Sequence, residues 1–178
     1  EMPKVVLLGG GTGSYELLLG LKEWTPHITA VINMCDDGGS TGRLRVEQGV
    51  MPPGDIRQCL VALSNNPEIA NLFSYRFDAG ELAGHPVGNL ILAALEREKH
   101  NFKAAIEVAS DMLNITGKVV PVTLTNHQLV MQDGEVNIRG QEAVRLHVCQ
   151  NRERKLWLEP EATITAEAQQ AIAEADLV

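Results

Sequence analysis

The fold is decided by residues 4–14, which read KVVLLGGGTGS. Residues 4–9 are a short apolar run closed by glycine, which is typical of a buried strand. Residues 15–22 then repeat leucine at helical spacing, and residues 28–34 form a second run that is rich in β-branched side chains. This order predicts a βαβ unit, and therefore an α/β fold with a parallel sheet whose carboxyl edge carries the glycine loop.

The glycine loop after the first strand has the composition of a phosphate-binding turn. Gly10, Gly11 and Gly13 let the backbone turn tightly and expose N–H groups at a helix N-terminus, where the helix dipole favours an anion. Thr12 adds a hydroxyl donor. The loop lacks the lysine of a P-loop, and Ser14 stands where the dinucleotide fingerprint has its third glycine. We predict phosphate binding here, with a tight turn that binds nothing as the alternative.

A second candidate loop, DDGGSTGRLR, follows the second apolar run. Asp36 and Asp37 have the position and chemistry to accept from a ribose, to hold a divalent cation or to act as a general base. Arg43 offers a bidentate fork to a phosphate. A second anion nest is predicted from small residues that expose backbone N–H groups: Gly38, Gly39 and Ser40. The alternative is a solvated acidic turn followed by a surface arginine.

Two further motifs, PPGDIR and GHPVGN, lie at predicted helix starts. Asp55 is interpreted either as the N-cap of a helix over residues 56–64 or as a site carboxylate. Arg57 in the first turn of that helix opposes the helix dipole, a conflict that an anionic ligand would resolve. His85 and Asn89 are candidate substrate-binding residues, although a lone histidine is more often structural. Asp37 and Asp55 are the candidate catalytic bases and the candidate Mg²⁺ ligands.

Composition excludes several classes of protein. The chain has 178 residues, 44% of them hydrophobic and 21% charged, which predicts a single folded domain over residues 1–178. A net charge of −8 disfavours nucleic acid as a partner. No apolar run is long enough for a membrane span, and no signal-peptide pattern is present. Cys35, Cys59 and Cys149 are widely separated, so we expect buried reduced thiols and a cytoplasmic protein.

The rest of the chain predicts helices that cover a sheet, followed by an antiparallel excursion. Residues 35–54 show no apolar periodicity and are predicted to form a long functional loop. Helices are predicted at residues 56–64, 67–77, 87–99, 102–113 and 165–175. The excursion spans about residues 119–158, with a hairpin turn at Asp133-Gly134. Its predicted strands are residues 119–124, 128–131, 136–138, 143–149 and 156–158. The sequence stops where another buried parallel strand is predicted, so we expect part of the fold to lie beyond it.

The succession GGGTG, DDGGSTGRLR, PPGDIRQCLVALS, YRF and GHPVGN resembles the family of YvcK-type gluconeogenesis factors and CofD-type 2-phospho-L-lactate transferases. The resemblance covers residues 4 to about 121, and the ending AIAEADLV is also similar. It implies a modified Rossmann-like, three-layer fold that binds a nucleotide diphosphate, often as a homodimer. The loop that begins DDGGS is similar to that of the gluconeogenesis factors.

This resemblance implies a regulatory protein that binds a UDP-sugar such as UDP-N-acetylglucosamine and is linked to carbon metabolism and cell shape. The two glycine loops would cradle the diphosphate, Arg43 and Arg57 would neutralise it, and Asp36, Asp37 and Asp55 would engage hydroxyls or Mg²⁺. One alternative is a Mg²⁺-dependent enzyme that moves a phospholactyl group from a guanosine diphosphate-linked donor to a deazaflavin. Another is an NAD-dependent oxidoreductase with Asp36 on the ribose.

Overall fold

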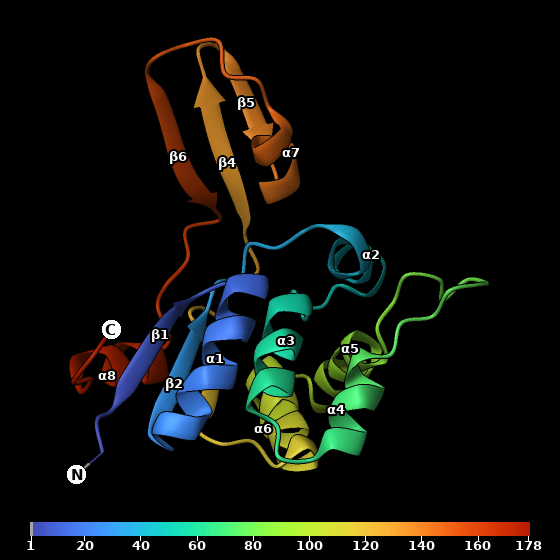
Figure 1. The fold of residues 1–178 in the computed structure, drawn as a ribbon. Coiled ribbons are helices and arrows are strands. Elements are labelled where there is room, and N and C mark those ends of the chain that lie inside the picture. The colour runs from blue at the N-terminus through green and yellow to red at the C-terminus, as the bar shows by residue number, and fades with distance from the viewer. Residues whose placement is uncertain (1) are drawn as a thin grey trace.

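The computed structural model describes residues 2–178, and its centre is a parallel sheet with the order β1-β2-β3 (Figure 1). The strands are β1 (Val5–Gly9), β2 (Ile28–Ile32) and β3 (Lys118–Pro121). Both pairings are parallel, and Val31 of β2 stands beside Leu8 on one side and Val120 on the other. The predicted βαβ unit is therefore confirmed, and the glycine loop follows the carboxyl end of β1.

Helices cover both faces of this sheet, which gives three layers. Because side chains alternate along a strand, Leu7, Ala30 and Ile32 point into the larger core. The helices that supply the rest of that core are α1 (Thr12–Trp24), α3 (Gly54–Leu63), α4 (Pro67–Ser74), α5 (Val87–Lys99) and α6 (Phe102–Leu113). On the opposite face, Val6, Val31 and Val120 pack against Ala168 of α8 (Ala166–Ala173).

A second, antiparallel sheet projects from this body as an arm, defined here as residues 128–159 (Figure 1). Its strands, in the order β5-β4-β6, are β4 (Gln128–Asp133), β5 (Val136–Arg139) and β6 (Arg154–Glu159). The short helix α7 (Gln141–Leu146) follows β5. Gly134, with a φ of 66°, lies in the turn between Asp133 and Val136, so the predicted hairpin is confirmed.

Three predictions of local structure are wrong. The predicted loop over residues 35–54 contains the helix α2 (Gly39–Gln48). This helix has no apolar face that the sequence could show, because Leu44 is its only buried apolar side chain and Val46 is 86% exposed. The predicted strand over residues 143–149 is largely α7, which buries no residue. The segment 119–124 is not antiparallel, because β3 pairs in parallel with β2, so the excursion begins at Gln128. In addition, α4 ends at Ser74 rather than Phe77.

The last residues of the chain lie along the outer edge of β1. Leu177 forms a parallel bridge with Val5, and its carbonyl accepts from Val6 N at 2.9 Å. The pairing is parallel, as predicted for the end of the sequence, but it is an isolated bridge rather than a buried strand, because Leu177 is 51% exposed. Nowhere in residues 2–178 is there a helix long and apolar enough to cross a membrane. The three cysteines are free, but of the three only Cys59 is buried as expected: Cys35 is half-buried, and Cys149 is exposed in the irregular segment that follows α7.

Candidate functional site

Three helix N-termini meet at the carboxyl edge of the parallel sheet. The N-cap residues of α1, α2 and α3 are Gly11, Gly38 and Pro53, and none of them makes a side-chain capping bond. The first backbone N–H groups of these helices therefore lack an intrahelical or capping partner, and the helix dipoles favour an anion in front of them. The predicted glycine loops supply two of the three N-termini.

The glycines of the first loop are packed against α3. A Cβ atom added to Gly11 would collide with the carboxylate of Asp55 and lie 2.8 Å from Gln58 Nε2. A Cβ atom on Gly10 would lie 3.1 Å from Asp55 Oδ2, whereas one on Gly13 would meet nothing within 4 Å. Gly10 and Gly11 thus allow the Asp55 carboxylate to approach the backbone, which no larger residue would permit.

A buried chain of hydrogen bonds joins four of the predicted site residues. Arg57 Nε donates to Asn89 Oδ1 at 3.0 Å, and Asn89 Nδ2 donates to Ser40 Oγ at 3.0 Å. Ser40 Oγ lies 2.7 Å from His85 Nδ1. Burial, followed by the nearby charge of Arg43, lowers the pKa of His85, which keeps its imidazole neutral at pH 7. The α2, α3 and α5 segments are therefore locked together directly beneath the candidate anion site.

Arg57 is a buried cation that makes no direct ion pair, although the charge of Asp55 acts on it from nearby. The residue is 8% exposed, and it forms no ion pair in the part of the chain that the structure describes. Burial, with a smaller effect from Arg76, lowers the pKa of its guanidinium to about 10, so the group remains charged at pH 7. Its two terminal nitrogens make no hydrogen bond within residues 2–178 and are not sealed from solvent. A buried cation without a direct ion pair is costly, and a bound anion would lower that cost.

Asp55 is not the N-cap of α3, since Pro53 occupies that position. Its carboxylate faces Gly10 and Gly11 instead. Burial and, to a smaller extent, the neighbouring charge of Asp36 raise the pKa of Asp55 to about 6, against the opposing effect of Arg57. Asp55 therefore titrates close to neutral pH beside the first glycine loop, as expected of a functional rather than a capping carboxylate.

Of the two adjacent carboxylates of the second loop, Asp36 is the one whose charge acts on Asp55. Asp36 Oδ1 accepts from Gly38 N at 3.1 Å, whereas Asp37 Oδ1 accepts from Glu142 N of the arm at 2.9 Å. No group of three or more metal-ligating side chains occurs within residues 2–178. Two carboxylates nevertheless suit Mg²⁺, which commonly takes one or two protein carboxylates and completes its coordination with water and substrate phosphates.

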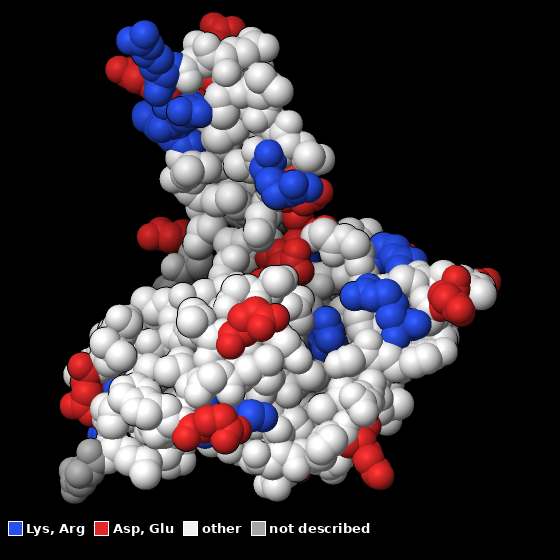
Figure 2. All heavy atoms as spheres, viewed as in Figure 1, with Lys and Arg blue, Asp and Glu red and all other residues white. Residues whose placement is uncertain are grey.

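The guanidinium groups of Arg43 and Arg76 both contact the segment that precedes α5. Arg43 Nη2 donates to Ala83 O at 2.7 Å, so the exposed guanidinium of this predicted phosphate ligand is held beside the segment that precedes α5. Figure 2 shows basic side chains gathered beside α2 and this segment. Arg76, which the sequence reasoning did not select, donates to Gly84 O from the same segment. Its presence in the motif YRF was the one available signal.

Arg45 and His127 were also missed, and they connect the site to the arm. Arg45 Nη1 donates to Asp36 O at 2.9 Å, while its Nη2 donates to Asn126 Oδ1 at 2.8 Å and to the carbonyl of His127. His127 Nε2 lies 3.1 Å from Cys35 Sγ, and its Nδ1 lies 2.7 Å from Thr125 O. The helices α3 to α6 and the strand β3 lie between residues 35–45 and 125–127 in the sequence, so no local pattern predicts this contact.

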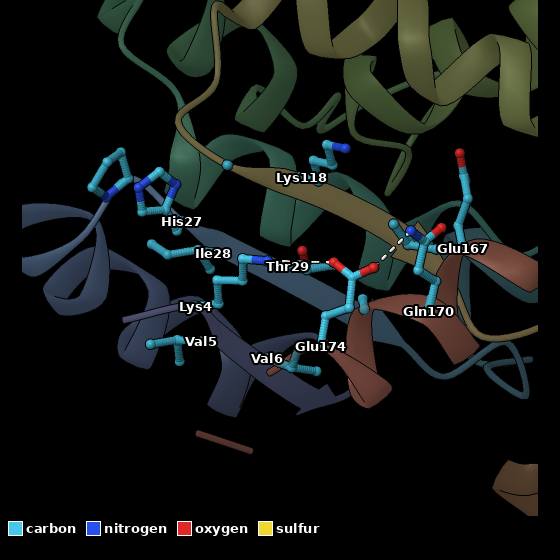
Figure 3. A pocket seen from close by; sticks show the side chains of 14 residues that line it. Lys4, Val5, Val6, His27, Ile28, Thr29, Lys118, Glu167, Gln170 and Glu174 are labelled. Carbon is cyan, nitrogen blue, oxygen red and sulfur yellow. Dashed lines mark hydrogen bonds and ion pairs between the residues drawn. The ribbon is translucent and has the colours of Figure 1, made fainter. Parts of the chain in front are cut away.

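A cavity of about 400 Å³ lies at the other end of the sheet, beside the amino ends of the strands (Figure 3). Lys4, His27 and Lys118 line it, and the exposed ion pair between Lys4 and Glu174 crosses it at 3.4 Å. In parallel α/β sheets ligands bind at the carboxyl ends of the strands. The hydrogen-bonded polar side chains and Asp55, whose pKa is raised, also lie at the carboxyl edge, so this edge is the candidate site.

A parallel sheet with glycine loops and helix N-termini at its carboxyl edge defines a Rossmann-like α/β protein. The particular family follows from comparison with known proteins. The chain belongs to the CofD family, whose model, described as 2-phospho-L-lactate transferase CofD, matches residues 5–178.

Relatives within this family support the assignment. The gluconeogenesis factor of Listeria innocua is 42% identical over 99% of this chain and 55% of its own length, and that of Bacillus subtilis is 42% identical over 100% and 57%. A crystal structure of a Bacillus halodurans protein superimposes with a TM-score of 0.90 at 38% identity, covering 99% of this chain and 58% of that one. The chain thus spans little more than half the length of these relatives.

Proposed function

We propose that the carboxyl edge binds the diphosphate of a nucleotide sugar such as UDP-N-acetylglucosamine. In this proposal the backbone N–H groups of Gly10 to Gly13, together with those of Gly39 and Ser40, cradle the phosphates, while the N–H of Gly38 donates to Asp36. Arg43 and Arg57 neutralise them. Substrate hydroxyls are received by polar side chains around the loops, namely Asp36, Asp55, His85 and Asn89, whereas Asp37 accepts from Glu142 N of the arm.

Arg57 is the observation that carries this proposal. Its guanidinium is buried, it forms no ion pair within the described chain, and its free donors reach solvent beside two helix N-termini. A diphosphate supplies the missing negative charge and accepts the unused hydrogen bonds. Asn89 and Ser40 fix the orientation of the guanidinium before the ligand arrives, which reduces the entropic cost of binding.

Ligand preference tests the proposal directly. Titration calorimetry should compare UDP-N-acetylglucosamine with GDP, each with and without Mg²⁺. We expect the UDP-sugar to bind more tightly, and Arg43→Ala to weaken it by about 1.5–3 kcal/mol through loss of a charged hydrogen bond. Arg97→Gln is the matched control, because Arg97 also donates to a backbone carbonyl, that of Gln48, but is not part of the predicted site. Equal affinity of Arg43→Ala and the unaltered chain would remove Arg43 from the site.

Group transfer is the second candidate function, and the Asp36 and Asp55 carboxylates favour it. Mg²⁺ held there would neutralise diphosphate charge during transfer of a phospholactyl group. Asp55, with a pKa raised to about 6, is suited to accept a proton near neutral pH. The assay is to supply a phospholactyl guanosine diphosphate donor and a deazaflavin acceptor and to look for product; tight UDP-sugar binding without turnover would count against this candidate.

The wider role proposed for the whole protein is that of the gluconeogenesis factors: a cytoplasmic homodimer that reports nucleotide-sugar levels to carbon metabolism and cell shape. The names of the Listeria innocua and Bacillus subtilis relatives support the metabolic part of this proposal. Saturation trials with NAD address the remaining oxidoreductase alternative, since that alternative requires nicotinamide cofactor binding.

A further inference from the structure

The strand β6 forms one edge of the arm, and its outer backbone edge has no partner within residues 2–178. The sheet order β5-β4-β6 places β4 on one side of β6, and no backbone hydrogen bond leaves the other side. Figure 1 shows β6 on the side of the arm opposite to β5 and α7. An edge strand offers its unpaired N–H and C=O groups to any further strand. The six residues Arg154–Glu159 are available in this way.

The middle of β6 does not shield this edge. Natural sheets protect an edge strand with prolines, bulges or charged side chains. The pairing of β6 with β4 runs without a bulge, and three apolar residues are consecutive at its centre: Leu156, Trp157 and Leu158. Leu156 is 62% exposed. The charged side chains Lys155 and Glu159 flank this apolar centre, which remains open to a pairing strand.

Residues 155–159, KLWLE, are self-complementary when two copies pair antiparallel. In a symmetric pair a two-fold axis runs perpendicular to the sheet. With Trp157 on this axis, Lys155 stands opposite Glu159 of the second copy, and Leu156 stands opposite its Leu158. Symmetry repeats both contacts, and opposite charges directly across two strands attract. Moving the axis by one residue in either direction would place a charged side chain opposite an apolar one, so charge selects a single register.

Both charged groups can accept this additional partner. Lys155 forms no ion pair within the described residues 2–178. Glu159 uses Oε2 for an exposed ion pair with Arg139 Nε at 2.9 Å, which leaves Oε1 for a second cation. Lys155, Trp157 and Glu159 lie on one face of the sheet, because side chains alternate along a strand. The half-buried Trp157 would cover its remaining surface against the same residue of the second copy.

We propose that β6 pairs antiparallel with β6 of a second copy of this chain, so that two three-stranded arm sheets join into one continuous sheet. The inference gives an interface to the homodimer of the proposed function and rests on that homodimer. A second copy is the occupant because the register that pairs the charges uses the same five residues on both sides, as a two-fold interface requires. The contact is small for a protein interface, so we expect a dissociation constant in the micromolar range.

Charge exchange tests this interface on the full chain. Sedimentation equilibrium at about 1–100 µM compares the unaltered protein with Lys155→Glu and Glu159→Lys. Each variant places two like-charged pairs across the two-fold axis and should weaken dimerisation about tenfold. The double variant restores opposite charges and should dimerise again. An equimolar mixture of the two single variants should form a heterodimer, since both of its charge pairs are then opposite.

Arg152→Glu is the matched control, because it makes the same change of charge as Lys155→Glu on an exposed residue of the arm outside β6. It should leave dimerisation unchanged. A dimer that neither exchange weakens, or that neither the double variant nor the mixture restores, would overturn pairing through β6 while keeping the homodimer. If the full chain stays monomeric at about 100 µM, both the interface and the homodimer fail.

The opposite role for Lys155 is to protect the edge from pairing. It predicts a monomeric unaltered chain that associates when Lys155→Gln removes the charge, and that result would also overturn the inference. Calorimetric titration of UDP-N-acetylglucosamine on the same preparations reads the diphosphate site separately. Loss of that binding would contradict the proposed ligand, whereas only the sedimentation results decide on β6.

Discussion

Asp37 Oδ1 accepts a hydrogen bond from Glu142 N at 2.9 Å, across 105 residues of sequence. The bond places a carboxylate at the N-terminus of α7, which has Gly140 as its N-cap and no side-chain capping bond of its own. Asp37 therefore serves as the cap of a helix in the arm while its neighbour Asp36 stays at the candidate site. The loop after β2 is shared by the site and the arm.

Replacement of Asp37 by alanine should loosen the arm without unfolding the body. The hydrogen bond contributes about 1 kcal/mol, so we expect exchange of the amide of Glu142 and its neighbours in α7 to accelerate about fivefold. Hydrogen exchange resolved by residue measures this effect. The control is Asp111→Ala, an exposed carboxylate on α6. Unchanged exchange in α7 would show that Asp37 does not hold the arm.

Asp55→Asn should stabilise the chain at alkaline pH. The pKa of Asp55 in the folded chain, about 6, lies above its ordinary value, so the folded state binds this proton more tightly than the unfolded state does. The resulting stability is present at low pH and is lost as the pH rises through about 6. Asparagine avoids that loss, and we expect the variant to exceed the unaltered chain by about 1–2 kcal/mol at pH 8 and by nothing near pH 4. Urea unfolding across this pH range, with Asp111→Asn as control, measures the difference.

Diphosphate binding should depend on the protonation of the same carboxylate. Ionised Asp55 beside Gly10 and Gly11 repels a phosphate, whereas protonated Asp55 can donate to it. UDP-N-acetylglucosamine, whose own diphosphate does not titrate near pH 6, should therefore bind more tightly as the pH falls from about 7.5 to about 5, or when Mg²⁺ bridges the two groups. In Asp55→Asn both effects should shrink. Calorimetric titrations that show the same pH and Mg²⁺ dependence in the variant would assign them to other groups.

Arg57→Gln should separate binding from stability. Loss of the charged hydrogen bonds should weaken diphosphate ligands by about 1.5–3 kcal/mol. The free energy of unfolding should change little or rise, because the variant removes a buried charge that has no ion-pair partner, and glutamine can still donate to Asn89. Denaturant unfolding and calorimetry on the same preparation provide both numbers. A large loss of stability would mean that Arg57 is a structural group.

The sequence predicted those parts of the fold that local patterns encode. The run at residues 4–14, the Asp133-Gly134 turn and the periodic helices each carry their signal within a few residues. The helix α2 was missed because a helix that buries little apolar surface has no such pattern, and α7 was missed for the same reason. The parallel pairing of β3 with β2 depends on contacts more than eighty residues apart, which alternation alone does not reveal.

The predicted binding site stays a prediction, but the structure shows how the side chains of its residues are arranged. Four predicted residues, Ser40, Arg57, His85 and Asn89, do lie in one hydrogen-bonded chain, but nothing in their spacing orders them. Asp36 and Asp37 are adjacent in sequence and have opposite surroundings, because successive residues point in different directions. Arg45 donates to the backbone carbonyls of Asp36 and of the distant His127, and Arg76 donates to that of Gly84, contacts for which the sequence has no signature.

Gly11→Ala and Gly13→Ala offer a matched pair for the first loop. A methyl group at Gly11 would collide with the Asp55 carboxylate and crowd Gln58, so α1 and α3 would have to separate; we expect a loss of about 1–3 kcal/mol in the free energy of unfolding. A methyl group at Gly13 meets open space inside α1, where alanine is the better helix former, so that variant should gain up to about 1 kcal/mol. Gly11→Ala should also weaken diphosphate binding, because it moves both Asp55 and the backbone amides of the loop. Gly13→Ala should leave the affinity unchanged, because it leaves both in place. Equal behaviour of the two variants in unfolding and in calorimetry would mean that the close approach of Asp55 to Gly11 is not what requires glycine in this loop.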